Sequence, residues 1–268
     1  LAAMPYAVWL FLAIEQLPLA AEESVDPKRD MPKGLLLGIL TLIISATLVL
    51  TLNTAISPGA FKISSSGEPL LEGFRTIYGT GTAKILASIA VIGLIASFHT
   101  IIFAFGRQIY SLSRAGYFPQ ALSVTSGQSK VPYAALLTGA VIGLAVMMMV
   151  FYVGGEAKVG TTLLNVAVFG AMISYMFQSL SFILLRIKKP QMPRPYRSPF
   201  GIVGAMVTII IAAITLYFQF LDPAYQTAMM GAAGWYVLGI LYFAVIGRHK
   251  LVLSPEEEFA LTGKAHHL

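Results

Sequence analysis

Residues 34–56 read GLLLGILTLIISATLVLTLNTAI and contain no Asp, Glu, Lys or Arg. About 20 apolar helical residues cross the hydrocarbon core of a bilayer, so this segment is long enough to span a membrane. Its apolar residues surround the helix instead of following one face at the period of about 3.6 residues that a soluble amphipathic helix shows. The segment therefore predicts a transmembrane helix.

Five further segments have the same character, in a chain that is 57% apolar and only 11% charged. They are residues 85–106, 132–153, 161–185, 200–221 and 225–247. A seventh candidate, residues 2–21, is apolar apart from Glu15. We predict an all-α, polytopic membrane helix bundle with seven spans, since a soluble domain carries about a quarter of its residues as charged side chains.

The loops predict the topology. Alternate loops carry 14 Lys and Arg on one side and 4 on the other, and the basic side is expected to be cytoplasmic. This places residue 1 outside and the tail, residues 248–268, inside. An external start without Met or a basic leader suggests that upstream helices of the same protein are missing from this chain. The net charge of +6 lies in short loops, which favours a lipid surface and not nucleic acid as its partner.

Several kinds of site are not expected. The chain has no cysteine, which excludes disulfides and thiolate metal ligands. It has no Gly-x-x-x-x-Gly-Lys-Ser/Thr loop for nucleotide-driven work. His249, His266 and His267 lie in the tail without a carboxylate cluster, so we predict no metal site. We likewise predict no cofactor and no catalytic residue.

Of the 30 Asp, Glu, Lys and Arg residues, only Glu15 falls inside a predicted span, near the middle of the membrane. A carboxylate at this depth costs roughly 2.5 kcal/mol or more, so it must face a cavity or a partner. The expected ligand of this carboxylate is a cation or a proton. Glu15 is therefore the predicted site of substrate binding and of proton coupling.

Pro18 predicts a helix break beside Glu15, because its missing N–H leaves the Ile14 carbonyl without a helical donor. Gln16 and that carbonyl would add neutral polar groups suited to an ammonium ligand. Spacing of three places Trp9, Leu12 and Glu15 on one helical face, and an indole face attracts cations. In the structural alternative, Trp9 belongs to the external aromatic belt and Pro18 only kinks a packed helix.

Other polar residues in the spans are candidates of the same kind. His99 titrates near neutrality and lies between Ser97 and Thr100, which allows a ligand or proton-relay role. These side chains also suit a purely structural role in joining helices by hydrogen bonds. Asn165, Ser174 and Gln178 fit the structural role better.

Two motifs resemble the amino acid–polyamine–organocation transporters. The run Trp9-Leu-Phe-Leu-Ala-Ile-Glu15 with Ala20-Ala-Glu-Glu-Ser-Val-Asp-Pro-Lys-Arg-Asp-Met-Pro32 resembles that family's sixth helix and the loop after it. The run Gly106-Arg-Gln-Ile-Tyr-Ser-Leu-Ser-Arg-Ala-Gly-Tyr-Phe-Pro119 is similar to the loop after its eighth helix. Within the family, Gly93-Leu-Ile-Ala-Ser-Phe-His99 and Leu253-Ser-Pro-Glu-Glu-Glu-Phe-Ala260 look most like ethanolamine permeases.

The resemblance implies an inverted-repeat fold of the LeuT type in which broken first and sixth helices enclose the substrate. Residues 1–268 would form a single transmembrane domain, with the second five-helix repeat at about 2–187 and two further helices at 200–247. Ala13 stands where relatives usually have Gly, and Trp9, Leu12 and Glu15 match positions that contact substrate. The predicted substrate site comprises Trp9, Leu12, Ala13, Ile14, Glu15, Gln16, Ser97 and His99.

The expected function is secondary active transport of ethanolamine or a similar small amine across the inner membrane of a bacterium, by alternating access and coupled to a proton or cation. An amino acid or polyamine permease is the alternative in the same class. An intramembrane enzyme would need at least two catalytic side chains within hydrogen-bond reach, which Glu15 and His99 could supply. A structural membrane subunit would leave Glu15 unexplained.

Overall fold

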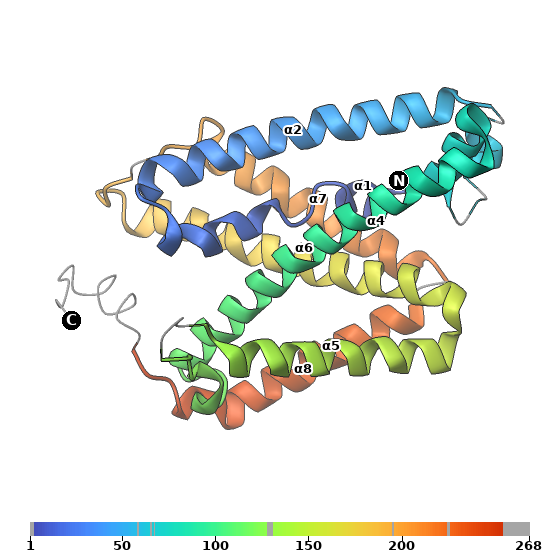
Figure 1. Ribbon diagram of the computed structural model, residues 1–268. Coiled ribbons are helices and arrows are strands. Elements are labelled where there is room, and N and C mark those ends of the chain that lie inside the picture. The colour runs from blue at the N-terminus through green and yellow to red at the C-terminus, as the bar shows by residue number, and fades with distance from the viewer. Residues whose placement is uncertain are drawn as a thin grey trace. The chain divides into compact units, whose positions relative to one another are not determined.

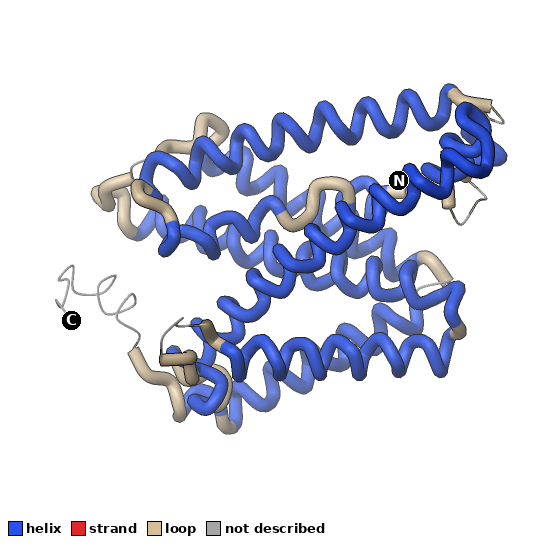
Figure 2. Tube along the Cα trace, in the orientation of Figure 1, coloured by secondary structure: helices blue, strands red, loops and turns tan. Residues whose placement is uncertain are grey.

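The computed structural model describes residues 3–57, 59–64, 66, 68–127, 131–194, 196–223 and 226–253. All regular secondary structure in these residues is helical (Figure 2). Within them, seven helices are long and apolar enough to cross a membrane, which confirms the predicted all-α, seven-span fold class. The tail motif from residue 254 onward lies outside the described residues.

The helices labelled in Figure 1 follow the predicted spans in order. The α-helices are α1 (Met4–Trp9), α2 (Pro27–Ala55), α3 (Ala60–Ile63), α4 (Pro69–Arg114), α5 (Tyr133–Gly154), α6 (Glu156–Lys188), α7 (Gly201–Leu221) and α8 (Gln226–Val245). The 3-10 helices are η1 (Ile14–Glu23), η2 (Gln120–Ser123) and η3 (Gly247–His249).

Helix α2 shows why these segments fold as they do in an apolar solvent. Pro27 begins the helix, where the missing N–H costs nothing. The Thr41 hydroxyl donates to the Leu37 carbonyl at 2.8 Å, and the Thr47 hydroxyl donates to Ile43 at 2.7 Å. Since these threonine hydroxyls return their hydrogen bonds to the same helix, they need no water within the bilayer.

The ends of the helices depart from the predicted loops in two places. Helix α4 continues to Arg114, through residues that the sequence assigns to an internal loop, and it is kinked at Gly79, whose φ is 74° and ψ is 168°. The predicted linker 154–160 is reduced to one residue, Gly155, with φ 74° and ψ 166°. This backbone conformation is almost restricted to glycine, so Gly155 permits the reversal between α5 and α6.

The described chain divides into two compact units, one formed by residues 1–12 and 104–268 and the other by residues 13–103. In the first unit, α6 packs on α7 around Val168, Met172 and Ala212, which are almost completely buried. The Leu136 side chain of α5 occupies the space that Gly106 of α4 leaves by having no side chain. The Phe105 ring of α4 packs in the same way against Gly139 of α5. Small residues thus allow close helix packing, as expected where lipid removes the hydrophobic driving force.

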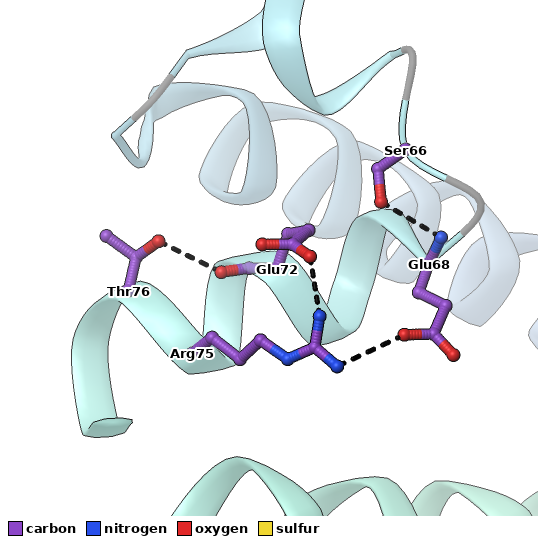
Figure 3. Close-up of polar contacts among 5 residues, drawn as sticks. All are labelled: Ser66, Glu68, Glu72, Arg75 and Thr76. Atoms are coloured by element: carbon purple, nitrogen blue, oxygen red, sulfur yellow. Dashed lines mark hydrogen bonds and ion pairs between the residues drawn. The ribbon is translucent and has the colours of Figure 1, made fainter. Parts of the chain in front are cut away.

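In the second unit, the connection from α2 to α4 is held by polar contacts at the start of α4 (Figure 3). The Ser66 hydroxyl accepts the Glu68 N–H at 3.0 Å. The Arg75 guanidinium donates to Glu72 at 2.6 Å and to Glu68 at 3.4 Å. These ion pairs are exposed, and each is worth at most about 1 kcal/mol, so they order the start of the helix without creating a buried site.

Candidate functional site

The first span is interrupted in the middle. Helix α1 ends at Trp9, residues 10–13 form turns, and η1 begins at Ile14, which Figure 2 shows as a tan segment between two blue ones. Ala13 has φ 79° and ψ −10°, the only non-glycine residue with positive φ in the described chain. The left-handed conformation costs an L-residue roughly 1–2 kcal/mol. The break therefore forms here against a backbone cost that a glycine would have avoided.

The prediction that Trp9, Leu12 and Glu15 share one helical face is wrong, because no continuous helix joins these residues. Spacing of three puts side chains on one face only if the backbone stays helical between them. Here the turns and the reversed φ of Ala13 intervene. The break also lies before Glu15, whereas Pro18 is inside η1.

The 3-10 geometry of η1 changes which carbonyl Pro18 leaves free. In an α-helix the missing N–H would have bonded to Ile14, but in a 3-10 helix each N–H bonds to the carbonyl three residues earlier. The Gln16 N–H, for example, donates to the Ala13 carbonyl at 3.1 Å. The freed carbonyl is therefore that of Glu15, and the prediction for the Ile14 carbonyl is corrected.

Glu15 and Gln16 each carry a buried oxygen without a hydrogen-bond donor among the described residues. These atoms are the Glu15 Oε2 and the Gln16 Oε1. A buried acceptor left unpaired costs about 1–3 kcal/mol, and more if it is charged. Together with the Glu15 carbonyl, to which Pro18 has no N–H to donate, the start of η1 offers three acceptors, which suits a ligand rich in N–H donors or a transferable proton.

The other predicted residues of the first span lie in different surroundings. Leu12 packs against the cluster of Val168, Met172 and Ala212 in the first unit, so its side chain takes part in that core. Trp9 belongs to the same unit and is 42% exposed. Ile14 belongs to the second unit, where its side chain faces Gly38 of α2. The structure thus gives Leu12 and Ile14 packing roles.

Ser97 and His99 lie on α4, in the exposed part of the second unit. The His99 Nδ1 is 2.8 Å from the Ile95 carbonyl, and the Thr100 hydroxyl donates to the Ala96 carbonyl at 3.2 Å. These bonds stay within one helix and join no helices in the described chain. A role for Ser97 and His99 in substrate binding stays a prediction.

A buried amide pair joins α6 to α7. The Gln219 Nε2 donates to the Asn165 carbonyl at 3.0 Å and to the Asn165 Oδ1 at 3.3 Å, and both side chains are 1% exposed. This arrangement supports the structural reading of Asn165. Gln219 was not predicted from the sequence, although an amide in a span without charged residues is a usable signal. The Gln178 amide instead bonds to Ser174 within α6.

The sequence is similar to known permeases and transporters over most of its length. The sequence profile of the amino acid permease family matches residues 1–246. An uncharacterized transporter of Rhizobium meliloti (strain 1021) is 25% identical over 258 residues, covering 96% of this chain and 53% of that protein. The chain spans about half the length of the curated relatives it matches.

Two relatives of Bacillus subtilis (strain 168) have more specific names. A methylthioribose transporter is 28% identical over 248 residues, covering 90% of this chain and 50% of that protein. A branched-chain amino acid permease is 25% identical over 244 residues, covering 89% of this chain and 49% of that protein. The substrates in these names differ widely in chemistry.

Proposed function

The chain belongs to the amino acid permease family, and on that premise we propose that the protein is a secondary active transporter for ethanolamine or a similar small primary amine. The relatives are permeases and transporters and not enzymes, and the seven apolar helices belong to a multi-pass membrane protein. We place it in the cytoplasmic membrane of a bacterium, with residue 1 outside and the tail inside.

The observation that carries the proposal is the unpaired Glu15 carboxylate oxygen at a helix break. Non-helical backbone at membrane depth is tolerated only where protein or a water-filled cavity covers it. The carboxylate, the Gln16 amide oxygen and the Glu15 carbonyl are all acceptors. A protonated primary amine presents three N–H donors and one positive charge, so it complements this set.

The proposed mechanism is alternating access. Glu15 pairs with the ammonium group or with a coupled proton, and the turns at residues 10–13 allow the two halves of the broken span to reorient around it. Trp9, Ser97 and His99 are proposed to contribute from elsewhere in the site, on the basis of the sequence. No covalent step is needed, because the solute is moved and not changed.

An amino acid or polyamine permease is the alternative that the relatives favour most directly, since one of them is named a branched-chain amino acid permease. An amino acid would also need donor groups for its carboxylate, whereas the unpaired side-chain atoms at the start of η1 are acceptors. Binding of ethanolamine to the purified full-length protein, measured beside spermidine, leucine and glycine, separates these substrates. Tight binding of leucine with none of ethanolamine would reject the amine proposal.

Replacing the acid tests the mechanism. Glu15→Gln keeps the shape of the side chain and removes its charge, so uptake of labelled ethanolamine into proteoliposomes containing the full-length protein should be abolished. Glu23→Gln, at the exposed end of the same 3-10 helix, is the matched control and should transport normally. Unimpaired uptake by Glu15→Gln would remove the central role proposed for this carboxylate.

A further inference from the structure

Helix α2 carries two glycines one turn apart, Gly34 and Gly38, and both face η1. A Cβ atom at Gly34 would lie 2.8 Å from the Leu17 Cδ2. A Cβ atom at Gly38 would come within 3.0 Å of the Ile14 Cδ1. Each glycine therefore provides the space for one side chain of η1, and the two side chains flank Glu15 and Gln16 in sequence.

The spacing of these contacts matches a 3-10 helix. Residues three apart in a 3-10 helix, such as Ile14 and Leu17, stack in one row with a rise of about 6 Å, since the rise is about 2.0 Å per residue. Residues four apart in an α-helix, such as Gly34 and Gly38, also rise by about 6 Å. The order of the contacts is antiparallel, with Ile14 against Gly38 and Leu17 against Gly34, so the equal spacing lets both contacts form together.

An α-helical η1 would match the glycines less well. Ile14 and Leu17 would still share a face, but they would rise by only about 4.5 Å and diverge by about 60° around the axis, against the spacing of about 6 Å between the two glycines. In the 3-10 form, rows lie about 120° apart, and Glu15 occupies a row next to the one that faces α2. The row of Ile14 and Leu17 therefore fixes the direction of the carboxylate.

We propose that Gly34 and Gly38 are positioning residues that hold the start of η1 in its 3-10 register and thereby orient Glu15 toward its ligand. This inference rests on the proposed function, because it assigns the glycines a part in the same site. They act only through Ile14 and Leu17, so they touch neither substrate nor proton themselves.

The test is a pair of substitutions at one contact. Gly38→Ala adds the Cβ that meets the Ile14 Cδ1, while the next Ile14 atom, Cγ1, is 3.5 Å away. Ile14→Val deletes Cδ1, so Ile14→Val combined with Gly38→Ala should relieve the conflict. Gly143→Ala is the matched control, since a Cβ there, in the middle of α5, meets nothing within 4 Å.

The measurement is ethanolamine uptake by the full-length protein in proteoliposomes, with KM and maximal rate determined separately. The Ile14 Cδ1 is the end of a side chain and gives way in part, so η1 should shift by well under the roughly 1 Å that can cost about a hundredfold, and we expect Gly38→Ala to raise KM about threefold. The double variant should return toward the original KM, and Gly143→Ala should leave it unchanged.

Two outcomes would overturn the inference. One is an unchanged KM in Gly38→Ala, even with a lower maximal rate, since that pattern reports less folded protein and not a misplaced ligand group. The other is a double variant with a KM as high as that of Gly38→Ala. Glu15→Gln in the same assay separates the two proposals: if it transports normally, the proposed function fails, whatever the glycine variants do.

Discussion

Substituting Gly116 should release the segment after α8 from the loop after α4. Gly116 has a φ of 83°, and a Cβ atom there would come within 3.0 Å of the Lys250 carbonyl oxygen. The neighbouring Val252 N–H donates to the Ala115 carbonyl at 3.1 Å. Because the atoms that meet at Gly116 belong to two backbones, no side-chain rotation relieves the conflict in Gly116→Ala.

The expected cost has two parts. An alanine with positive φ carries about 1–3 kcal/mol of backbone strain. Displacing residues 250–252 also breaks the hydrogen bond from Val252 to Ala115, which contributes about 0.5–1.5 kcal/mol. Gly155→Ala isolates the first part, since Gly155 has a φ of 74° and nothing within 4 Å of its Cβ position.

Hydrogen exchange followed by mass spectrometry on the full-length protein measures the second part directly. In Gly116→Ala, the Val252 amide should exchange at least about tenfold faster, a factor that corresponds to about 1.4 kcal/mol in the opening equilibrium. In Gly155→Ala, the exchange rate of the Val252 amide should not change. If both variants left Val252 equally protected, the close backbone approach at Gly116 would not be what holds this segment.

Two further results are expected. Gln219→Leu removes one unpaired buried oxygen, the Gln219 Oε1, but leaves another, the Asn165 Oδ1, so its net cost to the free energy of unfolding should be about 1 kcal/mol. Gln219→Ala should cost about 2 kcal/mol more through the cavity it leaves, and equal losses in denaturation midpoints would contradict this. Since this chain has no cysteine, Phe61→Cys and Gln191→Cys report topology, and the positive-inside prediction requires an impermeant thiol reagent added to intact cells to label only the first.

The amino-acid sequence alone was sufficient for the fold class and the order of the spans. Segments such as residues 34–56 have no charged side chain, and a bilayer tolerates such segments only as helices that satisfy their own backbone. It also singled out Glu15, because a carboxylate deep in hydrocarbon is costly unless a cavity or a partner receives it. Both conclusions follow from the solvent and not from specific contacts.

Local conformation within the first span was beyond the same reasoning. The position of Pro18 correctly indicated an irregular helix, but it did not indicate that Ala13 would take a positive φ or that η1 would be a 3-10 helix. A 3-10 helix has poorer hydrogen-bond geometry than an α-helix, so a run of ten residues requires support from its surroundings. Here the glycine pair of α2 matches the 3-10 rise.

Tertiary structure likewise decided which polar residues meet. Asn165 and Gln219 are far apart in the chain, and nothing in either segment specifies the helix rotation that brings their amides within 3.3 Å. Leu12 had the right spacing for a site with Glu15, but the turn at residues 10–13 placed its side chain in the core around Val168. Hydropathy thus determines that a helix crosses the membrane, whereas the shapes of its neighbours determine which face it presents and where it breaks.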